Sequence, residues 1–314
     1  MENVTKMLEE IINDPFWRRM YRKFWSNIYG PTGTIDCGAC QKCRRYIKEE
    51  RKLNMSRPVP LQYVGEKFEE SSKRILFVGK EVYGELEQYI DTPQWDPFSY
   101  DNIRELYFQQ EGDFWKWVVK IAESVFQVGE DSFDHIAWTN LLKCKIYEAT
   151  PEKSTCIAPK KVIRYCIKEA GWIFKEISVV DPNIVVMLCG RRFGEPFINE
   201  LKHRYDTCRI LEEEPFGKEY FVYLHCGNRQ FIITRHPSRC PEDIAEKIIK
   251  SIILFGSAAK KKSKEGSDID IIIVVDDCSI SWDAELIAWY RDCLLYTSDA
   301  ADDGESVDLG GRRI

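Results

Sequence analysis

Four short apolar runs, separated by longer segments with helical periodicity, constrain the fold of this chain more than any other feature. They occupy residues 75–78, 135–139, 184–188 and 231–234. Each run is too short for a buried helix and is rich in β-branched or aromatic residues. Apolar strands joined by crossover helices are typical of a parallel sheet covered on both faces. We therefore predict an α/β fold with a four-stranded parallel sheet flanked by helices.

The segments between these runs supply the expected helices. Helical patterns cover about residues 101–127, 160–178 and 191–203, and the first ~30 residues are also helical in pattern. Residues 220–225 form an extra strand candidate, which turns at Gly227 and Asn228 into the fourth apolar run. The chain thus alternates strands and helices, as a parallel sheet requires.

Polar side chains follow three of the four predicted strands. Gly79 and Glu81 come after the first, Asn140 ends the second, and His236 and Ser238 come after the fourth. Open parallel sheets bind ligands at the carboxyl ends of their strands. We therefore expect these residues to lie along one edge of the sheet and to form a binding or catalytic site.

This arrangement resembles the uracil-DNA glycosylase superfamily. That family has a Gly-x-Asp-Pro-Tyr or Gly-Glu-x-Pro-Gly loop after its first strand, an Asn ending the next, and a His-Pro-Ser loop after the last. The matching elements here are the segments 79–84, 139–144 and 236–238, and the resemblance covers about residues 35–250. It implies hydrolysis of the N-glycosidic bond of uracil, or a related deaminated base, in DNA.

The resemblance also implies roles for single residues. Asn140 would read the edge of a flipped base, and Tyr83 would fill the space of a thymine methyl group. His236 would donate a hydrogen bond to the departing uracil, while Glu81 would orient water or stabilise the cationic sugar. The implied substrate-binding residues are Gly79, Tyr83, Phe98, as a stacking aromatic, and Ser238, as a phosphate ligand.

Three departures from the family pattern leave another function open. The carboxylate of the first loop is Glu81 rather than Asp, Val82 replaces the usual proline, and Arg239 follows the His-Pro-Ser element. The alternative is a non-catalytic nucleic-acid or nucleotide-binding module on the same fold, because fold alone does not decide activity.

Twelve cysteines raise the question of a metal centre. The amino-terminal residues lack the pattern of a signal peptide, which suggests a cytoplasmic protein, and cytoplasmic cysteines favour metal ligation or buried thiols over a disulfide framework. The resemblance extends to the iron–sulfur branch of the superfamily, and it implies a [4Fe–4S] cluster. Its implied ligands are Cys40, Cys43, Cys144 and Cys166.

Two alternatives to that cluster stay open. Zinc uses the same four-thiolate ligand set, and unligated thiols are the third possibility. Cys37 begins the Cys-x-x-Cys-x-x-Cys series and can substitute for Cys40 or Cys43. The other cysteines are interpreted as structural: Cys156, Cys189, Cys208, Cys226, Cys240 and Cys278.

A second motif set begins near residue 251. Residues 251–255 are a strand candidate that ends at Gly256 and Ser257, and Asp268 and Asp270 open a later apolar run. Aspartates at i and i+2 of a strand share one face, so both can hold magnesium ions, while the Gly-Ser pair suits a nucleotide phosphate. The pattern resembles the polymerase-β-type nucleotidyltransferases, which implies a nucleoside triphosphate partner.

The family needs a third carboxylate, and we find no candidate before Asp292. Residues 251–292 are therefore expected to be an incomplete domain, inactive as given. Its full-length form would transfer a nucleotide to protein, RNA or a small molecule. Residues 293–314 resemble the translation of a sequencing adapter, and Asp308 lies within them.

These interpretations give four segments: an amino-terminal helical segment (1–34), the glycosylase-like domain (35–250), the nucleotidyltransferase fragment (251–292) and the adapter-derived segment (293–314). The chain is 44% hydrophobic and 31% charged, which is typical of a soluble protein, and we expect no membrane partner. Its net charge is −6, yet residues 1–75 hold 15 Lys and Arg against 10 Asp and Glu. Local basic surface of this kind is what contacts phosphate.

Overall fold

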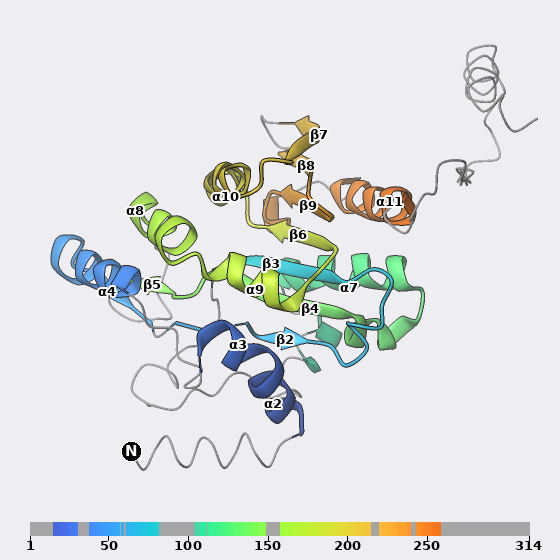
Figure 1. Cartoon of the computed structure of the whole chain (residues 1–314), viewed down its shortest axis with the longest axis horizontal. Coiled ribbons are helices and arrows are strands. Elements are labelled where there is room, and N and C mark those ends of the chain that lie inside the picture. The colour runs from blue at the N-terminus through green and yellow to red at the C-terminus, as the bar shows by residue number, and fades with distance from the viewer. Residues whose placement is uncertain are drawn as a thin grey trace, which may run out of the picture. The chain divides into compact units, whose positions relative to one another are not determined.

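The computed structural model describes residues 15–30, 38–56, 58–59, 61–81, 104–105, 107–110, 112–148, 158–214, 220–239 and 243–258. The chain divides into two compact units, residues 1–261 and 262–314. Every described residue belongs to the first unit, whose elements are drawn in Figure 1.

A mixed sheet of seven strands forms the centre of this unit, in the order β2-β4-β3-β6-β9-β8-β7. Its strands are β2 (Tyr63–Val64), β3 (Ile75–Glu81), β4 (Ile136–Leu142), β6 (Ile184–Leu188), β7 (Arg209–Glu214), β8 (Phe221–Cys226) and β9 (Arg229–Thr234). The four predicted strands are confirmed as β3, β4, β6 and β9, which pair in parallel. The predicted sheet was too small, because β2, β7 and β8 add antiparallel strands.

The four parallel strands have the spatial order β4-β3-β6-β9, so the chain reverses its direction across the sheet after β4. Such a reversal leaves a crevice at the carboxyl ends of the two strands on either side of the switch, here β3 and β6. The topology therefore puts the residues after β3 and β6 at the preferred ligand position of an open sheet.

The crossover helices cover the two faces of the sheet. The connections are α7 (Gly112–Phe126), the pair α8 (Lys160–Arg164) and α9 (Trp172–Val180), and α10 (Arg191–Arg204). In Figure 1, α9 lies in front of the sheet and α7 behind it. These helices confirm the three helical segments expected between the strands. Within the described residues, no helix is long and apolar enough to cross a membrane.

Shorter elements complete the unit. The amino-terminal helices are α2 (Pro15–Arg19), η1 (Met20–Trp25) and α3 (Ser26–Tyr29), followed by α4 (Gly38–Arg45) and η2 (Tyr46–Glu50). Strand β1 (Asn54–Met55) pairs with β5 (Ile146–Tyr147) in a separate two-stranded sheet. The remaining elements are η3 (Gly129–His135), η5 (Tyr165–Ala170), η7 (Pro237–Arg239) and α11 (Asp243–Ala258).

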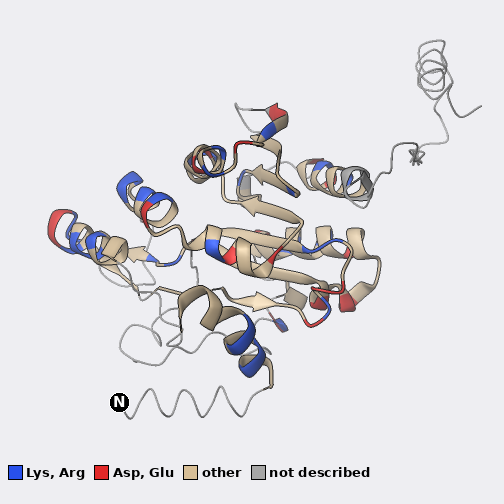
Figure 2. Cartoon of the chain, in the orientation of Figure 1, with Lys and Arg blue, Asp and Glu red and all other residues tan. Residues whose placement is uncertain are grey.

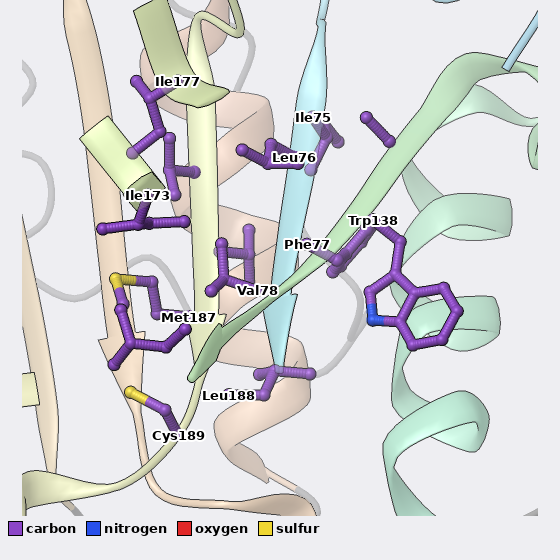
Figure 3. Close-up of a cluster of buried hydrophobic side chains, with 14 of the residues drawn as sticks. Ile75, Leu76, Phe77, Val78, Trp138, Ile173, Ile177, Met187, Leu188 and Cys189 are labelled. Carbon is purple, nitrogen blue, oxygen red and sulfur yellow. The ribbon is translucent and has the colours of Figure 1, made fainter. Parts of the chain in front are cut away.

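Apolar side chains fill both sides of the central strands. Ile173 and Ile177 of α9 are one helical turn apart and pack on one face of the sheet, as Figure 3 shows. Trp138 of β4 points toward α7 on the other face, where its ring centroid lies 4.6 Å from that of Trp115. The central strands are thus buried on both faces, which explains their unbroken apolar runs.

The strand predicted at residues 251–255 is wrong, because these residues belong to helix α11. Ile244, Ile248 and Ile252 recur every four residues and are buried in the core of the first unit. This spacing presents one apolar stripe on a helix, and it outweighs the β-branched composition of the run. The boundary predicted at residue 250 consequently lies inside a helix.

The structure joins Cys208 and Cys226 in a disulfide. These two residues are therefore neither metal ligands nor free thiols, contrary to the general expectation for the cysteines. Arg209 of β7 faces His225 of β8, so the preceding Cys208 lies opposite Cys226 in the antiparallel pair. Strand pairing, which the sequence alone did not reveal, brings the two sulfurs together.

Candidate functional site

The carboxyl ends of β3 and β4 bring Gly79 and Asn140 together. The two residues are direct partners in the parallel pair, and the side chain of Asn140 is 5% exposed. A Cβ atom on residue 79 would collide with Asn140 Oδ1, and it would lie 3.5 Å from Phe114 Cε2. Glycine at position 79 therefore lets the amide of Asn140 lie across the end of β3.

Phe114 is a residue of this site that the sequence reasoning missed. It is partly buried in the first turn of α7, next to Gly79 and Asn140. In the sequence, an aromatic residue of an amphipathic helix is normally interpreted as a core residue. Only the position of Phe114 in the first turn of α7, near the strand ends, indicates that it belongs to the site. Phe98 was expected to supply the stacking aromatic, but Phe98 and Tyr83 lie outside the described residues.

Glu81 ends strand β3 with its side chain 13% exposed. One carboxylate oxygen, Oε1, pairs with Lys80 Nζ at 2.6 Å, while Oε2 is buried and has no hydrogen-bond partner among the described residues. A buried carboxylate oxygen without a donor is costly. Glu81 therefore has an oxygen able to accept a hydrogen bond from a ligand or water.

His236 and Ser238 hold each other after β9. The Nδ1 atom of His236 lies 2.9 Å from Ser238 Oγ and 3.4 Å from the Ser238 backbone nitrogen. The backbone N–H can only donate, so Nδ1 acts as the acceptor and the ring proton lies on Nε2. This tautomer presents a donor N–H. The segment η7 that contains Ser238 also contacts α7, the helix of Phe114.

The four cysteines proposed as ligands line one cavity. Cys40 and Cys43 come from α4, Cys166 comes from η5, and Cys144 follows β4. All four are outside disulfides. The cavity is also lined by Lys143 and by apolar or aromatic side chains that include Met55, Val162, Tyr165 and Trp172. Three segments that are distant in the sequence thus meet at this cavity. The spacing of the cysteines along the chain could not establish this by itself.

The thiols of this cavity are close enough to influence one another. Burial, together with the nearby Cys166 and Cys40 as negative charges, raises the pKa of the Cys43 thiol to about 12. Burial likewise raises the pKa of the Cys144 thiol well above its usual range, with Cys166 as the next cause. For Cys43 and Cys144, burial therefore disfavours the thiolate, which is the form that ligates a metal.

The described residues contain no group of three or more His, Cys, Asp or Glu side chains close enough to hold a single metal ion. A tetrahedral zinc with Zn–S bonds of about 2.3 Å needs its four sulfurs within roughly 4 Å of one another. The four cysteines therefore line a shared cavity without forming a ready zinc site.

A buried polar network adjoins the cavity. The Lys143 Nζ atom donates to Glu176 Oε2 at 2.6 Å and to Thr139 Oγ1 at 2.8 Å. Thr139 donates to the same carboxylate oxygen at 2.8 Å, and the Tyr29 hydroxyl donates to Glu176 Oε1. Burial lowers the pKa of Lys143, which the carboxylate of Glu176 opposes. The network ties α3, β4 and α9 together immediately beside Asn140 and Cys144.

The predicted nucleotidyltransferase residues are only partly within the described structure. Gly256 and Ser257 form the last turn of α11 instead of following a strand. Asp268 and Asp270 lie outside the described residues. The structure therefore brings none of these four residues to a described site.

Comparison with known proteins gives one family match. Residues 242–309 match the family described as "Polymerase beta, Nucleotidyltransferase". The matched range extends into residues 293–314, whose interpretation as adapter sequence stays a prediction. No curated protein matches the chain. Nothing in these comparisons supports the glycosylase resemblance, which also stays a prediction. What the match does establish is that residues 242–309 are a polymerase-β nucleotidyltransferase domain.

Proposed function

We propose that the first unit removes uracil, or a related deaminated base, from DNA by hydrolysis of the N-glycosidic bond. The observation that carries this proposal is the collection of Gly79, Glu81, Asn140 and His236 along one edge of four parallel strands. This edge is where open parallel sheets bind ligands.

The geometry gives each side chain a chemical task. Strands β4 and β9 are separated by β3 and β6, so their axes are about 14 Å apart at the usual strand spacing. A nucleobase held between Asn140 and His236 fits this separation. Asn140 would read the base edge, Nε2–H of His236 would stabilise negative charge on the leaving base, and Glu81 Oε2 would accept a proton from water.

We also propose that Cys40, Cys43, Cys144 and Cys166 hold a [4Fe–4S] cluster. The four thiols, from α4, η5 and the residues after β4, line one largely apolar cavity. The cluster would be structural, since such a group adds folding energy where its ligands meet.

The test of the cluster is elemental analysis of the protein purified without oxygen. We expect about four irons per chain and a brown protein, with Cys144→Ala and Cys166→Ala each losing the iron. Cys189→Ala is the matched control, because Cys189 is buried outside the cavity. Zinc in place of iron would replace the cluster with a structural zinc, and neither metal would reject the site.

The test of base excision is release of free uracil from single- and double-stranded DNA. His236→Ala should lower the rate by about 10²–10³-fold while leaving DNA binding intact, because its donor acts as charge builds on the base. Asn140→Ala should reduce both rate and discrimination against thymine. The exposed residues His203 and Gln109 supply matched controls, as His203→Ala and Gln109→Ala. DNA binding without release of uracil, hypoxanthine or xanthine would favour a binding module instead.

Nucleotidyl transfer is the second candidate function, supported by the family match of residues 242–309. Asp268 and Asp270 would hold Mg²⁺ and so bind a nucleoside triphosphate. We expect Mg²⁺-dependent ATP binding in calorimetry that is lost in the double variant Asp268→Asn, Asp270→Asn. The control is Asp283→Asn, which lies outside the Asp-x-Asp motif. Equal ATP binding by both variants would reject these ligands.

A further inference from the structure

The helices that line the cysteine cavity also carry many exposed Lys and Arg side chains. Figure 2 shows Lys and Arg gathered on α4 and on α8 with η5. Helix α4 contacts η5, so the two groups of cations lie on adjoining helices. The eight residues of this basic face are all exposed: Lys42, Arg44, Arg45, Lys48, Lys160, Lys161, Arg164 and Lys168.

Few carboxylates neutralise the basic face. Lys161 pairs with Glu50 at 3.2 Å and Arg164 pairs with Glu169 at 3.7 Å. The other six cations form no ion pair with any carboxylate in the described residues. The chain as a whole has a net charge of −6, so this concentration of positive charge is local.

Aromatic rings lie between the cations. Tyr46 and Tyr165 are partly buried where the two helices meet, with ring centroids 6.5 Å apart. Lys161 Nζ lies 4.2 Å from the centroid of the Tyr46 ring. Cations beside partly exposed aromatic rings are typical of surfaces that follow a nucleic-acid backbone and stack on its bases.

The far edge of the sheet has the opposite charge. Edge strand β7 carries the exposed residues Glu212 and Glu213. A polyanion approaching the molecule is therefore attracted to the basic face and repelled from β7. This separation favours one orientation of an anionic partner, which a uniformly charged surface would not.

We propose that the basic face binds the phosphate backbone of DNA, as a contact surface separate from the strand-end site. Each Lys or Arg that neutralises a phosphate releases counterions, which makes binding strongly dependent on salt. The choice of DNA over another polyanion rests on the proposed base excision. The backbone contact itself requires neither base release nor uracil.

The experiment measures binding of a fluorescently labelled, uracil-free oligonucleotide, single- and double-stranded, by anisotropy over a range of NaCl concentrations. The test variant replaces Lys42, Arg45, Lys48, Lys160 and Lys168 with Ala. We expect affinity to fall on the order of 10- to 100-fold, and the slope of log K against log salt to become shallower by about 3–4. The control replaces Lys120, Lys202 and Arg209, which are exposed outside the face, and should bind within about 2-fold of the parent.

An unchanged salt slope in the five-residue variant would overturn the proposal. So would a clear preference for RNA of the same sequence, or binding to vesicles containing phosphatidylserine with no binding to DNA.

Circular dichroism of the variant establishes that it is folded. A second variant confined to Lys160 and Lys168 should give a smaller loss of DNA affinity. Loss of DNA binding together with unchanged iron content separates this inference from the cluster proposal. DNA binding without uracil release separates it from the proposed base excision.

Discussion

The strand-end site and the cysteine cavity both depend on the end of strand β4, yet they treat polar groups in opposite ways. At the strand ends, Glu81 keeps a buried oxygen without a partner in the described structure. Beside the cavity, Glu176 accepts hydrogen bonds from three side chains. Polar groups that serve stability are fully paired, whereas a site keeps capacity for its ligand. The two regions thus differ in how completely their buried carboxylates are hydrogen-bonded within the described residues.

The largest effect should come from breaking the buried network. Glu176→Ala leaves the ammonium of Lys143 buried without its counter-ion, and this should cost about 3–5 kcal/mol of unfolding free energy. Urea denaturation followed by tryptophan fluorescence measures the change. The control is Asp131→Ala, which removes an exposed ion pair with Lys67 and should cost less than about 1 kcal/mol. Equal losses in the two variants would contradict the division between the regions.

A second test addresses the strand-end site. Gly79→Ala introduces a methyl group that collides with Asn140 Oδ1, and overpacking of this kind should cost about 1–3 kcal/mol. Gly38→Ala is the matched control, because no atom lies within 4 Å of its added methyl group. That variant should stay within about 0.5 kcal/mol of the parent in the same denaturation experiment. A neutral Gly79→Ala would mean that Asn140 is not held against β3.

A pH-dependent test concerns Cys189, a buried thiol that directly follows β6. Burial raises its pKa to about 12, against about 8.5 in an unfolded chain. The folded state therefore favours the protonated thiol, and its contribution is complete below pH 8.5 and lost as pH rises toward 12. The unfolding free energy falls by at most ~1.4 kcal/mol per pH unit from this group. Between pH 8.5 and 11, Cys189→Ala should lose stability less steeply than the parent; parallel slopes would contradict the burial argument.

The central strands were predictable because burial on both faces leaves a direct trace in the sequence. Strands β3, β4, β6 and β9 each contain a short apolar run, and each was expected near its position. The edge strands left no such trace. Strand β2 has only two residues, and β7 is exposed and acidic, so neither shows strand periodicity. Edge strands are fixed by their partners, which a local pattern does not contain.

The sites were predictable to different degrees for the same reason. Strand ends locate Asn140 and His236, since parallel strands share one carboxyl edge. The convergence of Cys40, Cys144 and Cys166 depends on packing between α4, β4 and η5, and was inferred only through family resemblance. Helix α11 was misread because β-branched residues suit both strands and buried helices, and only the four-residue spacing of Ile244, Ile248 and Ile252 distinguishes them.

Helix α11 has a consequence for the order of events during protein synthesis. The polymerase-β match begins at residue 242, whereas Ile244, Ile248 and Ile252 are buried in the core of the first unit. The first unit therefore cannot complete its core until the ribosome has begun the next domain. A nascent chain that stalls before residue 252 would expose the apolar surface that α11 covers, and such surfaces attract chaperones and proteases. Because helix α11 belongs to the core of the first unit and to the segment that matches the family, the first unit can finish folding only after synthesis of that segment has begun.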